Sequence, residues 1–174
     1  TIPRISQLTL KTNQFNLTTK RYHEDQIQKF SEDDDILINC AGVLGDNNSD
    51  FNYIFNINLR SNWCILKSYF NTKISKRIKI IFIGSSSYNH GKKDYMLYSS
   101  SKAALFNLYE GAKDYFNDTK IIIGLINPSR VNTKMISHLP KNKNNFYFDP
   151  IELAKTIKSF IIHLEKSNFI NLYK

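Results

Sequence analysis

The chain has 174 residues, a formal net charge of +9 and a hydrophobic content of 41%, which indicates one globular domain with one core. Its apolar runs stop far short of the ~20 residues that a membrane-spanning helix needs, so we expect no membrane span. The lysines are scattered along the chain without interleaved aromatic residues, which argues against a nucleic-acid surface.

The cysteines, the histidines and the first residues bear on compartment and metal binding. Cys40 and Cys64 form no metal-binding or redox spacing, and the histidines share no ligand spacing. The start, Thr1 to Arg4, lacks the basic and then apolar layout of a secretory signal. We therefore expect a cytoplasmic protein without a metal site.

Strands and helices alternate along the chain. Short apolar runs bounded by polar residues, glycine or proline predict strands over residues 35–42, 78–83, 121–126 and 169–173. Apolar residues at helical spacing predict helices over residues 51–72, 98–117 and 150–164. This alternation indicates an α/β fold, with a doubly wound parallel sheet and helices on both faces.

Four segments are expected to meet at one edge of this sheet. Ligands bind at the carboxyl ends of the strands in such sheets. The loop after Gly42, Ser85, the pair Pro128-Ser129 and the start of the helix at Tyr98 all fall at those ends. We therefore expect the functional site at this edge.

Three side chains at that edge suit hydride transfer. A tyrosine phenol titrates near pH ~10 and exchanges protons poorly at neutrality unless a cation stabilises its phenolate. Lys102 follows Tyr98 by one helical turn, so we expect its ammonium to face the same space and to lower the pKa of the phenol. Ser85 is then placed to hold the substrate oxygen.

Five short motifs are distinctive, and they cover Asn39 to Gly42, Asn58-Leu59, Ile83 to Ser85, Tyr98 to Leu105, and Asn127 to Met135. Together they resemble the short-chain dehydrogenase/reductase family, from about Asn16 to the end of the chain. Two residues depart from the family pattern: Cys40 stands where an Asn is usual, and Ser129 where a Gly is usual.

The resemblance implies an NAD or NADP cofactor and a set of catalytic residues. In this set Tyr98 exchanges a proton with the substrate oxygen and Ser85 polarises that oxygen. Lys102 lowers the pKa of Tyr98 and bonds the nicotinamide ribose, and Asn58 anchors a water chain that connects Lys102 to solvent. The implied cofactor-binding residues are Asn16, Asn39, Ala41, Gly42, Tyr98, Lys102, Pro128, Val131 and Thr133.

The Gly-rich phosphate loop of that family is not found in the chain, because none of the six glycines forms a G-x-x-x-G-x-G pattern before a helix. We therefore expect a single Rossmann-like oxidoreductase domain over residues 1–174 that lacks the first strand, first helix and second strand. We interpret the chain as the catalytic part of a longer protein; the alternative is a naturally short variant.

A narrower resemblance concerns reductase domains associated with cytidylyltransferases in the synthesis of capsule and teichoic polyol phosphates. It rests on the stretch from Ser85 to Lys92 and on the residues around Arg130. It implies a substrate phosphate near Ser87, His90 and Arg130, since a dianion needs cations near the pocket. The alternative is that these are loop residues in water.

The resemblance implies an oxidoreductase that interconverts a carbonyl and a secondary alcohol of a small molecule, such as a sugar or polyol phosphate. A 3-oxoacyl thioester reductase shares the same catalytic residues and is an alternative. A second alternative is a non-catalytic interaction module that has lost cofactor binding. The resemblance also implies homo-oligomers that pack through the helices at 51–72 and 98–117.

Overall fold

The computed structural model describes residues 36–137, 139 and 146–173. The strands in this part of the chain form one sheet in the order β1-β2-β3-β4, and neighbouring strands run parallel. Their bounds are β1 Ile36–Asn39, β2 Ile78–Ile83, β3 Ile121–Pro128 and β4 Asn168–Leu172. The prediction that the first strand, first helix and second strand of the family are missing concerns the part of the chain before β1, which lies outside the described residues. The candidate cofactor residue Asn16 lies there too.

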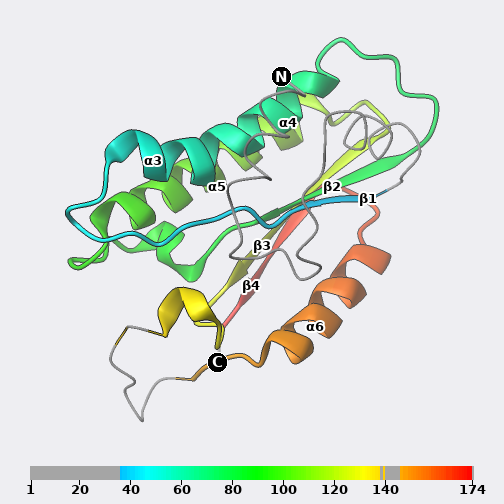
Figure 1. Ribbon diagram of the computed structural model, residues 1–174. Helices are drawn as coiled ribbons and strands as arrows, with labels where there is room; N and C mark the ends of the chain where they lie inside the picture. Colours follow the sequence, from blue (N-terminus) through cyan, green and yellow to red (C-terminus); the bar gives the residue numbers. More distant parts are fainter. Residues whose placement is uncertain (1–35, 138, 140–145, 174) are drawn as a thin grey trace.

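Helices lie on both faces of the sheet. Helices α3, α4 and α5 cover one face, and α6 covers the other (Figure 1). Their bounds are α3 Phe51–Phe55, α4 Ser61–Tyr69, α5 Met96–Tyr115 and α6 Pro150–Ile162. Short turns of other helix types are η1 Asn56–Arg60, η2 Ser86–Asn89 and η3 Lys134–Ile136. The predicted parallel α/β architecture is therefore confirmed.

The two central strands place alternate side chains in two separate cores, because successive residues of a strand face opposite sides of the sheet. Ile80 and Phe82 of β2 pack under α4 and α5 with Leu105. Ile81 packs on the opposite face with Ile161 of α6. All eight residues of β3 are buried, as expected of a strand covered on both faces.

The segment predicted as one helix over 51–72 contains a π-helical turn. Residues 51–69 are helical without a break, as predicted, but the turn η1 at Asn56–Arg60 is π-helical and α4 ends at Tyr69, three residues before the predicted end. The side chains of Ser61 and Asn62 donate hydrogen bonds to the carbonyls of Ile57 and Asn58, at 2.7 and 2.8 Å. These bonds satisfy carbonyl groups of the π-helical turn. Single π-helical turns of this kind are frequent at functional sites.

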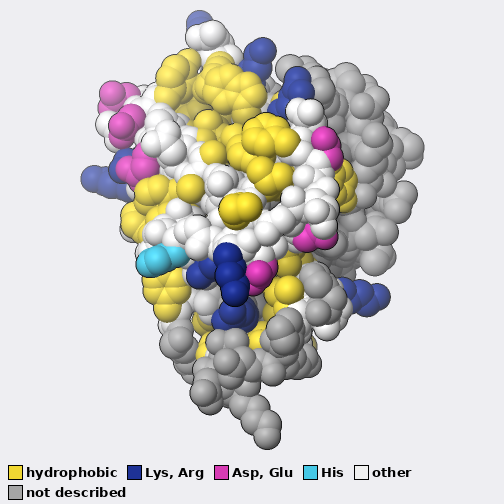
Figure 2. Space-filling view, turned by 90° about the vertical axis from the view of Figure 1, so that its left-hand side faces the viewer, with side chains coloured by type: hydrophobic (Ala, Val, Ile, Leu, Met, Phe, Trp, Pro, Cys, Tyr) yellow, Lys and Arg dark blue, Asp and Glu magenta, His cyan; other side chains and the backbone are white. Residues whose placement is uncertain are grey.

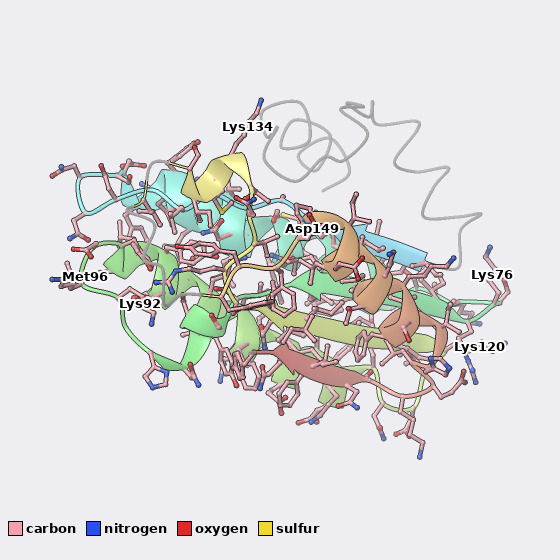
Figure 3. All side chains as sticks on the ribbon, turned by 90° about the horizontal axis from the view of Figure 1, so that it is seen from below. Lys76, Lys92, Met96, Lys120, Lys134 and Asp149 are labelled. Carbon is pink, nitrogen blue, oxygen red and sulfur yellow. The ribbon has the colours of Figure 1, made fainter. Side chains whose placement is uncertain are left out.

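Helix α6 begins where the proline predicts it. Asp149 caps its first turn by accepting hydrogen bonds from the backbone N–H groups of Ile151 and Glu152, and Pro150 occupies the first turn. Figure 3 shows Asp149 at this end of the helix. Among the described residues, no helix combines the length and the apolarity needed to cross a bilayer.

Candidate functional site

A pocket opens at the carboxyl ends of β1, β2 and β3, where the four segments were expected to meet. Figure 2 faces this side of the molecule and shows hydrophobic side chains beside a small group of basic ones. The predicted site residues that line the pocket are Ala41, Gly42, Ser85, Ser87, Tyr98, Lys102, Pro128, Arg130, Val131 and Thr133. The convergence predicted from the chain order is therefore present.

The hydroxyl groups of Ser85 and Tyr98 lie together in the lining of the pocket. Ser85 follows β2 with an extended backbone (φ −168°, ψ 151°), and its Oγ accepts a hydrogen bond from the backbone N–H of Ser87 at 3.1 Å. Tyr98 is half-buried in the first turns of α5. A hydrogen bond with Ser85 acts to lower the pKa of the Tyr98 phenol, because the serine hydroxyl favours the charged form.

Lys102 lies one helical turn after Tyr98 and is buried, with 4% of its surface exposed. Its Nζ donates a hydrogen bond to the carbonyl of Ile83 at 2.9 Å, and it lies 5.7 Å from the centroid of the Tyr98 ring. Burial lowers the pKa of Lys102 to about 8, and the Cys40 thiol acts in the opposite direction. An ammonium in this position is still mostly charged at neutral pH.

The pKa of Tyr98 moves opposite to the expected direction. Burial raises it above its ordinary value, a negative charge on Tyr95 would raise it further, and the Ser85 hydrogen bond only partly offsets these effects. The net pKa is thus raised and not lowered, because desolvation of the phenolate in the pocket is the largest effect; the expected lowering by the Lys102 ammonium stays a prediction. The phenol is therefore the resting form.

Asn58 is fully buried in the π-helical turn η1, behind the pocket. Its Oδ1 accepts from the N–H of Val43 at 2.8 Å, and its Nδ2 donates to the carbonyl of Val43 at 2.9 Å. The same Nδ2 donates to Ser101 Oγ at 3.0 Å. Asn58 thus ties the loop after β1 to helix α5, and its expected role toward a water chain stays a prediction.

The candidate cofactor residues fall into two groups. Most of them line the pocket, but Asn39 directs its side chain to α4, where Nδ2 donates to Asn62 Oδ1 at 2.9 Å and to Ser61 Oγ at 3.3 Å. Its Oδ1 accepts from the N–H of Ala41 at 3.1 Å. Asn39 therefore shapes the turn after β1 from behind the pocket, and its contact with a cofactor stays a prediction.

The candidate substrate residues also differ in position. Ser87 is buried and Arg130 is exposed, and both line the pocket. His90 is exposed after η2, and its Nδ1 lies 2.7 Å from Asn89 Oδ1. Among the pocket-lining residues described by the structure, Arg130 and Lys102 are the charged ones.

Two residues near the pocket had no predicted role. Tyr95 lines the pocket with its ring edge-on to Tyr98, at a centroid distance of 6.0 Å. Asn127 is fully buried, and its Oδ1 accepts from the backbone N–H of Ser85 at 3.2 Å. The sequence signal for Asn127 is a single polar residue at the end of an apolar strand.

Metal binding finds no support in the described part of the chain, where no group of three or more His, Cys, Asp or Glu side chains is placed to hold an ion. Cys40 lines the pocket, and burial raises the pKa of its thiol to about 11. The thiol is therefore protonated at neutral pH and is a poor nucleophile or ligand.

Comparison with protein families matches residues 9–144 to the short chain dehydrogenase family. A search of curated proteins finds no match to the chain. The family match covers most of the described residues, including the segments that carry Ser85, Tyr98 and Lys102.

Solved structures with the same fold include several dehydrogenases. A short chain dehydrogenase from Burkholderia cenocepacia J2315 in complex with NADP has a TM-score of 0.74 at 14% identity, covering 99% of this chain and 67% of the other. A putative short chain dehydrogenase from Escherichia coli CFT073 complexed with NADPH has a TM-score of 0.71 at 17% identity, with coverages of 99% and 69%.

A third similar structure is a dehydrogenase/reductase from Sinorhizobium meliloti 1021, with a TM-score of 0.69 at 20% identity, covering 85% of this chain. The chain spans 65% of the length of that protein. At these identities the likeness shows a shared Rossmann-like fold.

Proposed function

The chain belongs to the short-chain dehydrogenase family, a family of oxidoreductases, and on that premise we propose that it interconverts a carbonyl and a secondary alcohol with NAD or NADP. The observation that carries the proposal is the pairing of the Ser85 and Tyr98 hydroxyl groups beside the buried ammonium of Lys102. These groups suit the transfer of one proton to or from a substrate oxygen.

The resting protonation states favour reduction of a carbonyl. The nicotinamide cofactor, when bound, supplies the hydride. Tyr98 donates its phenolic proton to the substrate oxygen as negative charge develops there, and Ser85 hydrogen-bonds the same oxygen. The Lys102 ammonium then stabilises the phenolate that remains. Such a positioned proton donor typically contributes roughly 10²–10⁴-fold to the rate.

The residues around the ammonium fit a nicotinamide cofactor. A Cβ at Gly42 would lie 3.9 Å from both Lys102 Nζ and Met135 Cε, so glycine keeps this space beside the cation open. Ala41, Gly42, Pro128, Val131 and Thr133 would hold the cofactor with Lys102. The pocket encloses about 90 Å³, less than the ~300–1,000 Å³ of ligand pockets. We therefore expect buried side chains such as Met135 to move when the cofactor binds.

We further propose an anionic substrate, such as a sugar or polyol phosphate. The charged side chains among the described pocket-lining residues are cations, Lys102 inside and Arg130 at the exposed rim. Lys92 and Lys134 lie toward the same end of the molecule, whereas Lys76 and Lys120 lie at the opposite end (Figure 3). A guanidinium at the rim suits bidentate binding of a phosphate.

Activity and binding assays test the proposal. The full chain is mixed with NADPH or NADH and with a ketose phosphate, the same ketose without phosphate, and a 3-oxoacyl thioester, while cofactor absorbance is followed. We expect oxidation of the cofactor with the ketose phosphate, and loss of that activity in Tyr98→Phe with retained cofactor binding. Arg130→Ala is expected to lower the activity with the ketose phosphate and to leave the activity with the unphosphorylated ketose unchanged.

Each other outcome rejects part of the proposal. Activity with the thioester alone favours the 3-oxoacyl reductase. An absence of both turnover and cofactor binding, in this chain and in a longer version that carries a Gly-rich loop, rejects the enzyme and favours a non-catalytic module. Unchanged activity of Tyr98→Phe rejects Tyr98 as the acid and base.

We also propose that the chain forms homo-oligomers through the outer faces of α4 and α5. Trp63 and Tyr115 are 41% and 54% exposed, and both rings contact Phe70, at centroid distances of 5.4 and 4.7 Å. Exposed aromatic clusters of this kind mark interaction surfaces. Light scattering of the wild type and of Trp63→Glu tests this: a monomeric wild type rejects it.

A further inference from the structure

We propose that Asn127 is a positioning residue that holds Ser85 in place for the proposed reaction, and that Asn171 of β4 fixes the orientation of the Asn127 carboxamide. The inference rests on the proposed function, because it concerns the serine that would bind the substrate oxygen. It assigns a role in the site to the last strand of the sheet, which lines no part of the pocket.

The Asn127 side chain is enclosed, and both its oxygen and its nitrogen have a hydrogen-bond partner. It is 0% exposed at the end of a strand that is otherwise apolar. Its Oδ1 accepts from the backbone N–H of Ser85 at 3.2 Å, and its Nδ2 donates to Asn171 Oδ1 at 3.1 Å. Since buried polar groups are costly without partners, these two bonds determine which way the carboxamide points.

The hydrogen bond to Ser85 continues the β2–β3 ladder with a side chain. The N–H of Gly84 still donates to a strand carbonyl, that of Ile126, at 2.7 Å. The next N–H, that of Ser85, donates to the Asn127 carboxamide. Ser85 therefore leaves the strand with its backbone fixed, and its Oγ is directed toward Ser87 N–H and the Tyr98 phenol.

Asn171 makes the arrangement specific. It is the register partner of Asn127 on the parallel strand β4, so the two carboxamides lie side by side. Its Nδ2 donates to the Tyr88 hydroxyl at 3.3 Å. This hydroxyl belongs to η2, the turn that begins at the residue after Ser85. Asn127 and Asn171 therefore hold the loop after β2 at two points, the N–H of Ser85 and the hydroxyl of Tyr88.

Gly84 supplies independent evidence that the carboxamide is built against the backbone of this loop. A Cβ at residue 84 would clash directly with Asn127 Oδ1. The backbone of Gly84 has no φ in the left-handed region, so the requirement for glycine comes from the neighbouring carboxamide.

A double-mutant cycle between Asn127→Ala and Ser85→Ala tests the inference in the full chain. We expect Asn127→Ala to lower kcat by about 10²-fold, the scale of a misplaced catalytic group, with a smaller change in the KM of the cofactor. In the Ser85→Ala background the same substitution is expected to change kcat by less than about threefold, because residues that act as a unit are not additive. Equal losses in both backgrounds overturn the inference.

Asn171→Ala is a milder second variant, because Asn127 Oδ1 remains to accept the hydrogen bond from Ser85 N–H. If Asn127→Ala does not fold, Asn171→Ala replaces it in the double-mutant cycle with Ser85→Ala. Asn168→Ala is the matched control, because this asparagine is exposed at the other end of β4, where its Oδ1 accepts a hydrogen bond from the N–H of Phe169. We expect Asn171→Ala to lower kcat and Asn168→Ala to leave it unchanged. Equal kcat values for the two variants overturn the role of Asn171.

Amide hydrogen exchange at Ser85 tests the inference independently of any enzyme assay. We expect Asn127→Ala to accelerate exchange at Ser85 while Gly84, which bonds a strand carbonyl, keeps its protection. Unchanged exchange at Ser85 overturns the inference even in an active enzyme. Faster exchange in a chain that shows no turnover rejects the proposed function and leaves the positioning of Ser85 supported.

Discussion

The Nζ of Lys102 lies 2.9 Å from the carbonyl oxygen of Ile83 and 5.7 Å from the centroid of the Tyr98 ring. The ammonium is therefore held by the end of strand β2 while it faces the phenol from one helical turn away. Its burial has a cost, because a charged group loses its hydration. This cost gives Lys102 a measurable signature in both stability and catalysis.

The contribution of Lys102 to stability is expected to rise with pH above about 8. Lys102 has a pKa of about 8 in the folded chain and ~10.4 in the unfolded chain. Between these values the unfolded state binds more protons, so the free energy of unfolding increases with pH. At lower pH both states are protonated, and the folded state bears the full cost of the buried charge, on the order of 3 kcal/mol.

Denaturant unfolding between pH 7 and pH 10 measures this effect. The difference in unfolding free energy between the wild type and Lys102→Met is expected to move in favour of the wild type by a few kcal/mol across this range. Groups that do not interact with Lys102 titrate in both proteins and cancel in the difference. The Cys40 thiol, whose pKa is raised by burial and lowered in part by Lys102, does not cancel completely, so Cys40→Ala is used as the background for both proteins. A difference that stays constant with pH shows that the pKa of Lys102 is ordinary.

Catalysis is expected to lose a protonated group near pH 8. The proposed reduction uses the Lys102 ammonium to stabilise the phenolate of Tyr98, and kcat/KM reports pKa values of the free enzyme. The kcat/KM for carbonyl reduction should therefore fall as pH rises through about 8, the pKa of Lys102. A profile that stays flat well above this pH contradicts the role given to the ammonium.

The sequence predicted the parallel sheet and the edge at which the pocket opens because both follow from local patterns. Apolar runs identify β2 and β3, and the chain order then places Ser85 and Tyr98 at the same ends of the strands. The π-helical turn was not predictable in this way. It accompanies contacts between the Asn58 side chain and the backbone of Val43, fifteen residues earlier.

The direction of the Tyr98 pKa also depends on information that a motif does not hold. The spacing of Tyr98 and Lys102 correctly predicts that they face one space. The net effect on the phenol depends on how completely the surrounding pocket removes water, and there desolvation exceeds the hydrogen bond from Ser85. Side chains from several loops, including Met135, enclose that pocket.

Two glycines beside the pocket should respond differently to alanine. Gly45 has a φ of +64°, and a Cβ there would lie 2.5 Å from Ile54 Cδ1, so Gly45→Ala should cost about 1–3 kcal/mol of stability. Gly42 has ordinary backbone geometry and contacts no closer than 3.8 Å, so Gly42→Ala should change stability by less than about 1 kcal/mol.

Thermal unfolding and cofactor titration separate the two effects. Gly42→Ala is expected to fold normally and to bind NADPH or NADH more weakly, because its methyl group enters the space beside Lys102 Nζ. A variant that folds and binds both cofactors with unchanged affinity contradicts the proposed cofactor position.

The requirement for glycine at residue 84 is expected to disappear when Asn127 is shortened. Gly84→Ala in the wild type places a Cβ against Asn127 Oδ1, and such overpacking typically costs about 1–3 kcal/mol. In an Asn127→Ala background that oxygen is gone, and the new Cβ would then meet Leu125 Cδ1 at 3.2 Å. The second alanine should then cost much less, with a coupling energy of about 1–3 kcal/mol.

Urea unfolding of the two single variants and the double variant measures this coupling. Gly91→Ala serves as the control, because a Cβ there meets no atom within 4 Å and should be nearly neutral in both backgrounds. If Gly84→Ala lowers the free energy of unfolding equally with and without the Asn127 carboxamide, another part of the loop moves to accommodate the new Cβ. A large coupling places the carboxamide against the Gly84 backbone in solution, where it can hold the N–H of the next residue, Ser85.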